Sequence, residues 1–125
     1  MRPDIESRED LFKIVSDFYI DLLESKDLSH FFVSFKDEKV LKHHLETLVD
    51  FWDNTLFYSG TYKKNAIKPH IDIHDEKGIS GFHFDEWLSL FKKAVDSNFK
   101  GQNADTITSR ALSIATVMKL KLKVL

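Results

Sequence analysis

Three side chains with polar tips stand on the apolar faces of predicted helices, and they have the clearest capacity for chemistry. His44 lies in a leucine-rich helical stripe, Tyr19 on the apolar face of an earlier helix, and Trp87 on that of a later one. An imidazole can accept or donate a proton, and a buried phenol or indole needs a partner for its polar hydrogen. We therefore expect one of two arrangements. Either the three tips converge on one cavity, or each is a core or boundary side chain bonded to a backbone carbonyl.

A fourth candidate, His70, directly follows Pro69 in the least periodic part of the chain. Proline fixes φ and suits the first position of a helical turn, so the imidazole would be held in a defined direction, as a metal ligand requires. His74 lies four residues further on, a spacing that places two imidazoles on one helix face. Ile71 replaces the glutamate of zinc-protease motifs, and Pro69 and Gly78 leave room for barely two turns. A surface loop histidine is the alternative interpretation of His70, and a zinc site with His74 is less favoured than chance spacing.

Four amphipathic helices are predicted to position these residues. Apolar side chains recur at intervals of three and four over residues 11–22, 41–56, 84–95 and 107–122, the period of a helix with one buried face. Ser7, followed by Asp10, predicts the start of the first helix, and Asn103 is the candidate N-cap of the last. The second helix is expected over residues 37–57, after a tight corner at 27–32. The lack of periodicity over residues 58–81 predicts an irregular connection. The last six residues, 120–125, are expected to form a frayed helix end.

The composition predicts one domain spanning residues 1–125. Only four glycines and two prolines argue against a turn-rich β architecture, and eleven phenylalanines suit either a packed core or a site for a large flat apolar ligand. Eighteen basic and twenty acidic residues give a net charge of −2, without a basic face for nucleic acid or a membrane surface. The polar N-terminus and the lack of a long apolar run predict a soluble, cytoplasmic protein.

The sequence contains no recognisable motif for other kinds of catalytic or metal site. The chain lacks cysteine, which excludes disulfides and thiolate metal sites. We recognise no nucleophile elbow and no glycine-rich loop that could hold phosphate. Asp50 and Asp53 lie three residues apart on the predicted second helix, without a recognisable partner that would suggest acid–base catalysis.

Over residues 11–122 the chain resembles the group III truncated haemoglobins. The matching pieces keep the same order and similar intervals: Phe18-Tyr19, Asp27-Leu28 leading to Phe32, His44-Leu45 with Phe51-Trp52, the Tyr62 loop leading to His70, His83-Phe84 with Trp87-Leu88 and Phe91, and Phe99, Gly101 and Ala104 before Arg110-Ala111. The resemblance implies an all-α, globin-like fold, shortened to a truncated 2-over-2 helical sandwich. It also implies one non-covalent b-type haem, with which the absence of cysteine is compatible.

The resemblance implies a role for each of six residues. His70 matches the proximal histidine that ligates the haem iron, and Tyr19 and Trp87 match the distal residues that stabilise a bound ligand. His44 matches the residue at the distal gate. Two further residues are expected to contact the haem: Phe32 by stacking on it and Leu48 from the distal wall. The resemblance identifies no propionate partner, and the candidates from the sequence are Tyr62, Lys63, Lys68 and Arg110.

These roles imply a protein that binds O₂, NO or other diatomic molecules. One axial histidine leaves the sixth position of the iron open, and two hydrogen-bond donors beside it predict slow ligand release. The expected role is therefore detoxification of NO or reactive oxygen, rather than O₂ delivery. An enzymatic activity would be NO dioxygenation or peroxidase-like turnover, supplied with electrons by an unidentified reductase.

Two other kinds of protein remain as alternatives. The first is a globin-fold interaction or sensor domain that has lost its haem. The second is a small metal-binding helical bundle that uses the histidines at four positions, His43, His44, His70 and His74.

Overall fold

The computed structural model describes residues 2–57 and 81–122, and all regular elements in these two ranges are helices. In chain order they are α1 (Arg8–Glu24), the 3₁₀ helix η1 (Ser29–Lys36), α2 (Glu38–Phe57), α4 (Gly81–Asn98) and α5 (Gln102–Leu122). The four predicted amphipathic helices are therefore confirmed. The corner expected at residues 27–32 is longer than predicted, because η1 continues to Lys36 with a kink at Phe32.

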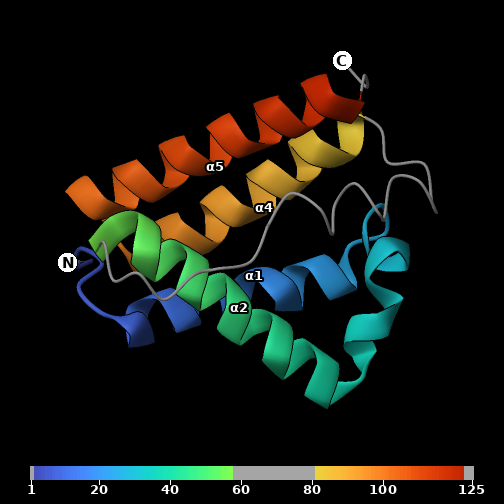
Figure 1. The fold of residues 1–125 in the computed structure, drawn as a ribbon, viewed down its shortest axis with the longest axis horizontal. Coiled ribbons are helices and arrows are strands. Elements are labelled where there is room, and N and C mark those ends of the chain that lie inside the picture. The colour runs from blue at the N-terminus through green and yellow to red at the C-terminus, as the bar shows by residue number, and fades with distance from the viewer. Residues whose placement is uncertain (1, 58–80, 123–125) are drawn as a thin grey trace.

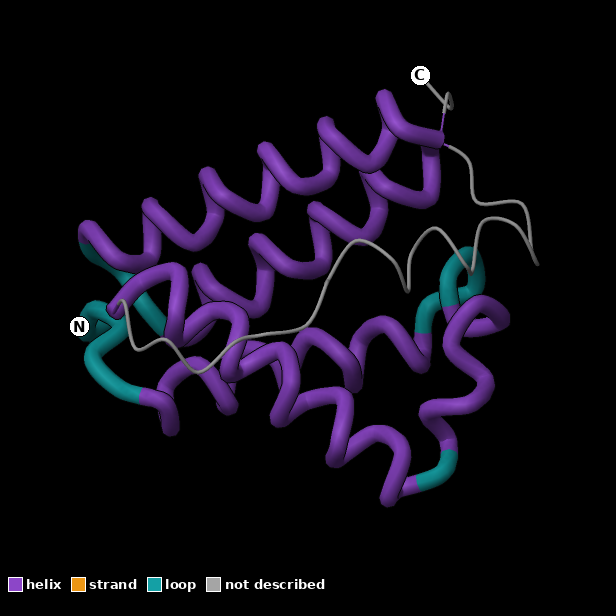
Figure 2. Tube along the Cα trace, viewed as in Figure 1, coloured by secondary structure: helices purple, strands orange, loops and turns teal. Residues whose placement is uncertain are grey.

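The four long helices form two antiparallel pairs (Figure 1). In one pair α4 and α5 run side by side in opposite directions, and in the other α1 and α2 cross at an angle. Helix α1 also packs against α4, so the two pairs share one core. The short η1 connects α1 to α2 at one end of the molecule and packs against both (Figure 2). This is the two-over-two arrangement that was expected.

Aromatic rings fill the centre of this core. The ring of Phe18, on α1, lies 5.3 Å from that of Tyr19, 5.5 Å from that of Trp87 and 5.2 Å from that of Phe91, each in an edge-to-face geometry. Edge-to-face contacts contribute about 0.5–1.5 kcal/mol each beyond the burial of apolar area. Because Phe18 lies on α1 and both Trp87 and Phe91 lie on α4, these contacts hold α1 against α4.

The start of α1 follows the sequence prediction. The Oγ of Ser7 accepts a hydrogen bond from the backbone N–H of Asp10 at 3.4 Å, so Ser7 is the N-cap. The carboxylate of Asp10 accepts in turn from the backbone N–H of Glu6 at 2.8 Å, one residue before the position used in a capping box.

The start of α5 differs from the prediction, because Asn103 is not its N-cap. Asn103 is the second residue of α5, and its side chain donates to the carbonyl of Ile5 at 2.8 Å. The carboxylate of Asp4 caps the helix instead, accepting from the backbone N–H groups of Asn103 and Ala104, both at 2.9 Å. The prediction was wrong because the cap comes from a segment 99 positions earlier, about which the residues around Asn103 carry no information.

None of the described helices combines the length and the apolar character needed to cross a membrane.

Candidate functional site

A largely apolar pocket lies where the two helix pairs meet. Its cavity volume is about 40 Å³, room for a small molecule, and it is partly open to solvent. Three of the predicted site residues, Tyr19, Leu48 and Trp87, line it together. The other lining residues are apolar or aromatic and come from all four long helices: Val15, Phe18, Phe51, Trp52, Phe91 and Ile114.

A hydrogen bond joins Tyr19 on α1 to His44 on α2. The Tyr19 Oη lies 2.6 Å from the His44 Nε2, and the two rings meet edge to face with their centroids 5.1 Å apart. Tyr19 is 2% exposed, and burial raises the pKa of its phenol, so the hydroxyl keeps its hydrogen at neutral pH. His44 is not among the described lining residues of the pocket, but its hydrogen bond to Tyr19 connects it to one of them.

The direction of this hydrogen bond depends on the protonation of His44. When Nε2 carries no hydrogen, it accepts the phenolic hydrogen of Tyr19. When Nε2 is protonated, it donates to the phenolic oxygen, and the hydrogen of Tyr19 becomes available to a third group. The pair can thus either retain its hydrogen or offer it to a ligand in the pocket.

The 3₁₀ helix η1 holds this pair in place through two phenylalanines. Phe35 stacks on His44 with ring centroids 4.4 Å apart, and Phe32 meets Tyr19 edge to face at 6.0 Å. Phe32 is buried and lies behind Tyr19; it is not among the described residues that line the pocket. Phe35 is a site residue that sequence analysis missed. Its signal is the three-residue spacing from Phe32, since residues i and i+3 align on one face of a 3₁₀ helix.

Trp87 is held by rings from both helix pairs. It lies edge to face with Phe18, and its ring is nearly parallel to that of Phe91, at 5.9 Å and 6°. Trp52 stacks against Phe91 as well, at 5.4 Å. The indole Nε1 of Trp87 is itself buried. Packing therefore fixes the orientation of an indole that borders the pocket.

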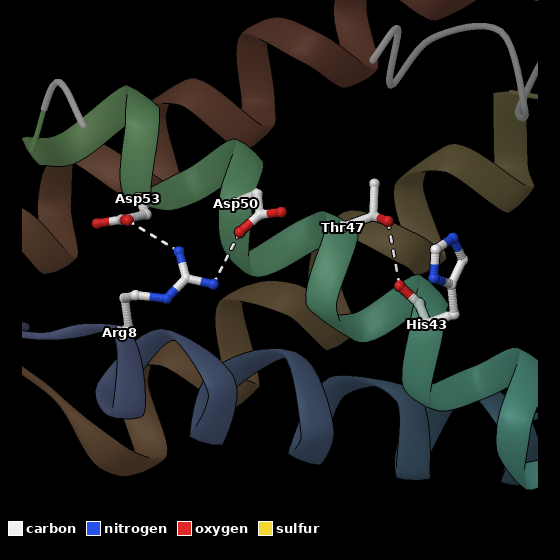
Figure 3. A network of polar contacts seen from close by, with 5 residues as sticks. All are labelled: Arg8, His43, Thr47, Asp50 and Asp53. Carbon is white, nitrogen blue, oxygen red and sulfur yellow. Dashed lines mark hydrogen bonds and ion pairs between the residues drawn. The ribbon is translucent and has the colours of Figure 1, made fainter. Parts of the chain in front are cut away.

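Arg8 joins the start of α1 to the second half of α2 (Figure 3). Its guanidinium donates to Asp50 at 2.7 Å and to Asp53 at 2.9 Å, and these two hydrogen bonds raise its pKa. The Asp53 side chain is 10% exposed, against 38% for Asp50. One turn before Asp50, the Thr47 hydroxyl donates to the carbonyl of His43. The two aspartates were recognisable from the sequence but Arg8 was not, because its contact with them depends on how α1 and α2 cross.

His70, Tyr62 and His74 lie outside the described residues, so their roles stay predictions. Within residues 2–57 and 81–122, no three histidine, aspartate or glutamate side chains gather closely enough to hold a metal ion. His43 is exposed, whereas the neighbouring His44 is half-buried against Tyr19.

The fold is that of a truncated haemoglobin. The chain is similar to the crystal structure of the group III truncated hemoglobin from Campylobacter jejuni, with a TM-score of 0.86 and 24% identity, covering 98% of this chain and 95% of that chain. In sequence it is 26% identical over 113 residues to the group 3 truncated hemoglobin ctb of Campylobacter jejuni, covering 88% of this chain and 86% of that protein. No family model matches the chain. The resemblance to group III truncated haemoglobins is therefore confirmed.

Proposed function

We propose that the chain binds one b-type haem and uses it to hold O₂, NO or another diatomic molecule beside Tyr19 and Trp87. The observation that carries this proposal is that two polar-tipped aromatic side chains, from different helices, border one apolar pocket. The similarity to group III truncated haemoglobins supports it independently.

The described residues match a large flat apolar ligand in chemical character. The pocket is lined almost entirely by rings and branched apolar side chains, the usual surroundings of such a group. When bound, haem supplies an iron atom whose sixth position can take a diatomic ligand. In the proposal His70 would hold the iron through a ring nitrogen, Phe32 and Leu48 would contact the ring system, and Tyr62 would contact a propionate.

Tyr19 and Trp87 would act on the ligand by donating hydrogen bonds. A diatomic ligand that carries partial negative charge is stabilised by roughly 1–3 kcal/mol for each such donor. Two donors would slow its release by on the order of a hundredfold. His44 would set how much Tyr19 contributes, because it either takes the phenolic hydrogen or leaves it to the ligand.

Slow release favours reaction of the ligand over its delivery. We therefore propose detoxification of NO or of reactive oxygen species as the role, with an unidentified reductase as the source of electrons. The chemistry would be NO dioxygenation or peroxidase-like turnover, since both can use an axial histidine together with distal donors.

The test is a visible absorption spectrum after haem reconstitution of the wild type, His70→Ala and His43→Ala. His43 is an exposed histidine on α2 and serves as the matched control. The proposal expects a stoichiometric Soret band in the wild type and in His43→Ala, and a lost or shifted band in His70→Ala. A wild type that takes up no haem would overturn the proposal in favour of a globin-fold interaction domain.

A further inference from the structure

The short contact between Tyr19 and His44 has the geometry of a proton-transfer pair. Their polar atoms are 2.6 Å apart, at the short end of the range for hydrogen bonds of this kind. Tyr19 is almost fully buried, and Phe32 and Phe35 enclose its ring from the side of η1. Phe35 also stacks on the imidazole, so both partners are held in register by one short helix.

This setting governs how the phenol can be oxidised. Loss of an electron makes a phenol strongly acidic, and a phenol cation in an apolar pocket would carry the full cost of a buried charge. Loss of the proton first is also unfavourable, because burial raises the pKa of Tyr19. Both costs are avoided when the proton moves to a base as the electron leaves. The imidazole of His44 is a base within hydrogen-bond reach.

We propose that Tyr19 and His44 form a proton-coupled redox pair that donates one electron to small oxidising radicals in the pocket. In the step, Tyr19 gives one electron to the oxidant while its O–H bond breaks and the proton forms a new N–H bond at Nε2 of His44. The products are a neutral phenoxyl radical, an imidazolium and the reduced oxidant.

The oxidant class is a small radical that accepts one electron. Nitrogen dioxide is an example: it takes the electron and becomes nitrite, whose negative charge balances the imidazolium. The pocket is suited to such molecules because it is apolar and partly open to solvent. Apart from the radical that accepts the electron, the step uses only Tyr19 and His44, so its test is separate from that of haem uptake.

The surrounding rings offer a competing site of oxidation. Phe18 contacts both Tyr19 and Trp87, and an indole can also lose one electron. Tyr19 has a described proton acceptor at 2.6 Å, which favours it as the residue where the radical settles. The location of the radical is therefore a direct readout of the proposal.

The experiment is photochemical oxidation of the full chain with a ruthenium tris-bipyridyl complex and a sacrificial electron acceptor. Electron paramagnetic resonance of rapidly frozen samples identifies the radical, and transient absorption gives its rate of formation. We expect a phenoxyl radical that Tyr19→Phe abolishes, and a slower rate in D₂O than in H₂O. In His44→Gln the amide oxygen can still accept a hydrogen bond but is a far weaker base, so the rate should fall by about tenfold or more.

Two further variants complete the test. His44→Phe removes the acceptor altogether while keeping a ring against Phe35, and should slow the reaction at least as much as His44→Gln. His43→Gln, at an exposed neighbouring position, should leave the rate unchanged. Circular dichroism identifies any variant that fails to fold, and each His44 variant can carry the test alone. A phenoxyl radical that forms equally fast in His44→Gln, or a radical on tryptophan or another tyrosine, would overturn the proposal.

Discussion

The carboxylate of Asp4 accepts a 2.9 Å hydrogen bond from the backbone N–H of Ala104, a residue 100 positions away. The neighbouring N–H of Asn103 donates to the other carboxylate oxygen, so one side chain satisfies two of the N–H groups that a helix leaves unpaired at its start. The negative charge also suits the positive end of the helix dipole. The carbonyl of Pro3 accepts from Lys100 nearby. The segment before α1 is therefore tied to the corner between α4 and α5.

Replacement of Asp4 by alanine should lower the free energy of unfolding by about 1–3 kcal/mol, the range for a lost helix cap with charge-assisted hydrogen bonds. Urea unfolding followed by circular dichroism measures it. Glu6→Ala is the matched control, because its side chain is exposed and close by in the sequence. Equal stabilities of the two variants would show that the cap contributes nothing.

The contribution of Asp4 should also depend on pH. Burial of the carboxylate opposes its charge, but hydrogen bonds from backbone N–H groups outweigh that cost and lower the pKa of Asp4 from its ordinary value of 3.8. A lowered pKa in the folded state means that the stabilisation is complete well above 3.8 and is lost as pH falls through the folded-state pKa. The difference in unfolding free energy between wild type and Asp4→Asn should therefore be constant near neutral pH and shrink below pH 3.8. A difference that grows in acid would contradict this assignment.

Gly101 should tolerate no side chain. Its φ is 151°, a conformation that residues with a Cβ rarely adopt, and a Cβ built there would lie 2.5 Å from the Cγ of Asp4. We expect Gly101→Ala to cost about 1–3 kcal/mol of stability through backbone strain, with a further cost from the collision. In the double variant with Asp4→Ala the contacts with the Asp4 Cγ and Oδ2 disappear, while the 2.7 Å contact with the Cβ of residue 4 and the backbone strain stay. The double variant should therefore lose less stability than the sum of the two single variants. Strict additivity in urea unfolding would exclude the close contact.

Arg8 should couple more strongly to Asp53 than to Asp50. Removal of the guanidinium leaves the Asp53 carboxylate buried without this partner, which costs about 1–3 kcal/mol, whereas the more exposed pair with Asp50 contributes about 0.2–1 kcal/mol. Double-mutant cycles of Arg8→Gln with Asp53→Asn and with Asp50→Asn measure the two coupling energies separately. A larger coupling to Asp50 would mean that burial does not control this network.

For the haem-loaded protein, Tyr19→Phe should release O₂ about tenfold faster or more, since it removes one charge-assisted hydrogen bond worth roughly 1–3 kcal/mol. Stopped-flow displacement of O₂ measures the rate. Trp87→Phe tests the second donor in the same way while keeping a ring beside Phe91. Unchanged release from Tyr19→Phe would show that the phenolic hydrogen stays with His44 in the ligand-bound protein.

Part of the site was predictable because its signals are local. The period of apolar residues placed Tyr19, Leu48 and Trp87 on buried helix faces, and the structure brings all three to one pocket. Ser7 was recognisable as an N-cap because its partner lies three residues away. His70 was singled out from its position after Pro69 and from the family resemblance, and its role stays a prediction.

The sequence by itself determined the helices, their starting cap at Ser7 and the faces that they bury, since each depends on residues within one or two turns. Only the tertiary structure decided that Asp4 caps α5, that Arg8 bridges to Asp53, and that Tyr19 reaches His44. These contacts join residues 25 to 100 positions apart. Their partners are selected by how whole helices cross and pack, and no pattern within a few turns of either residue encodes that geometry.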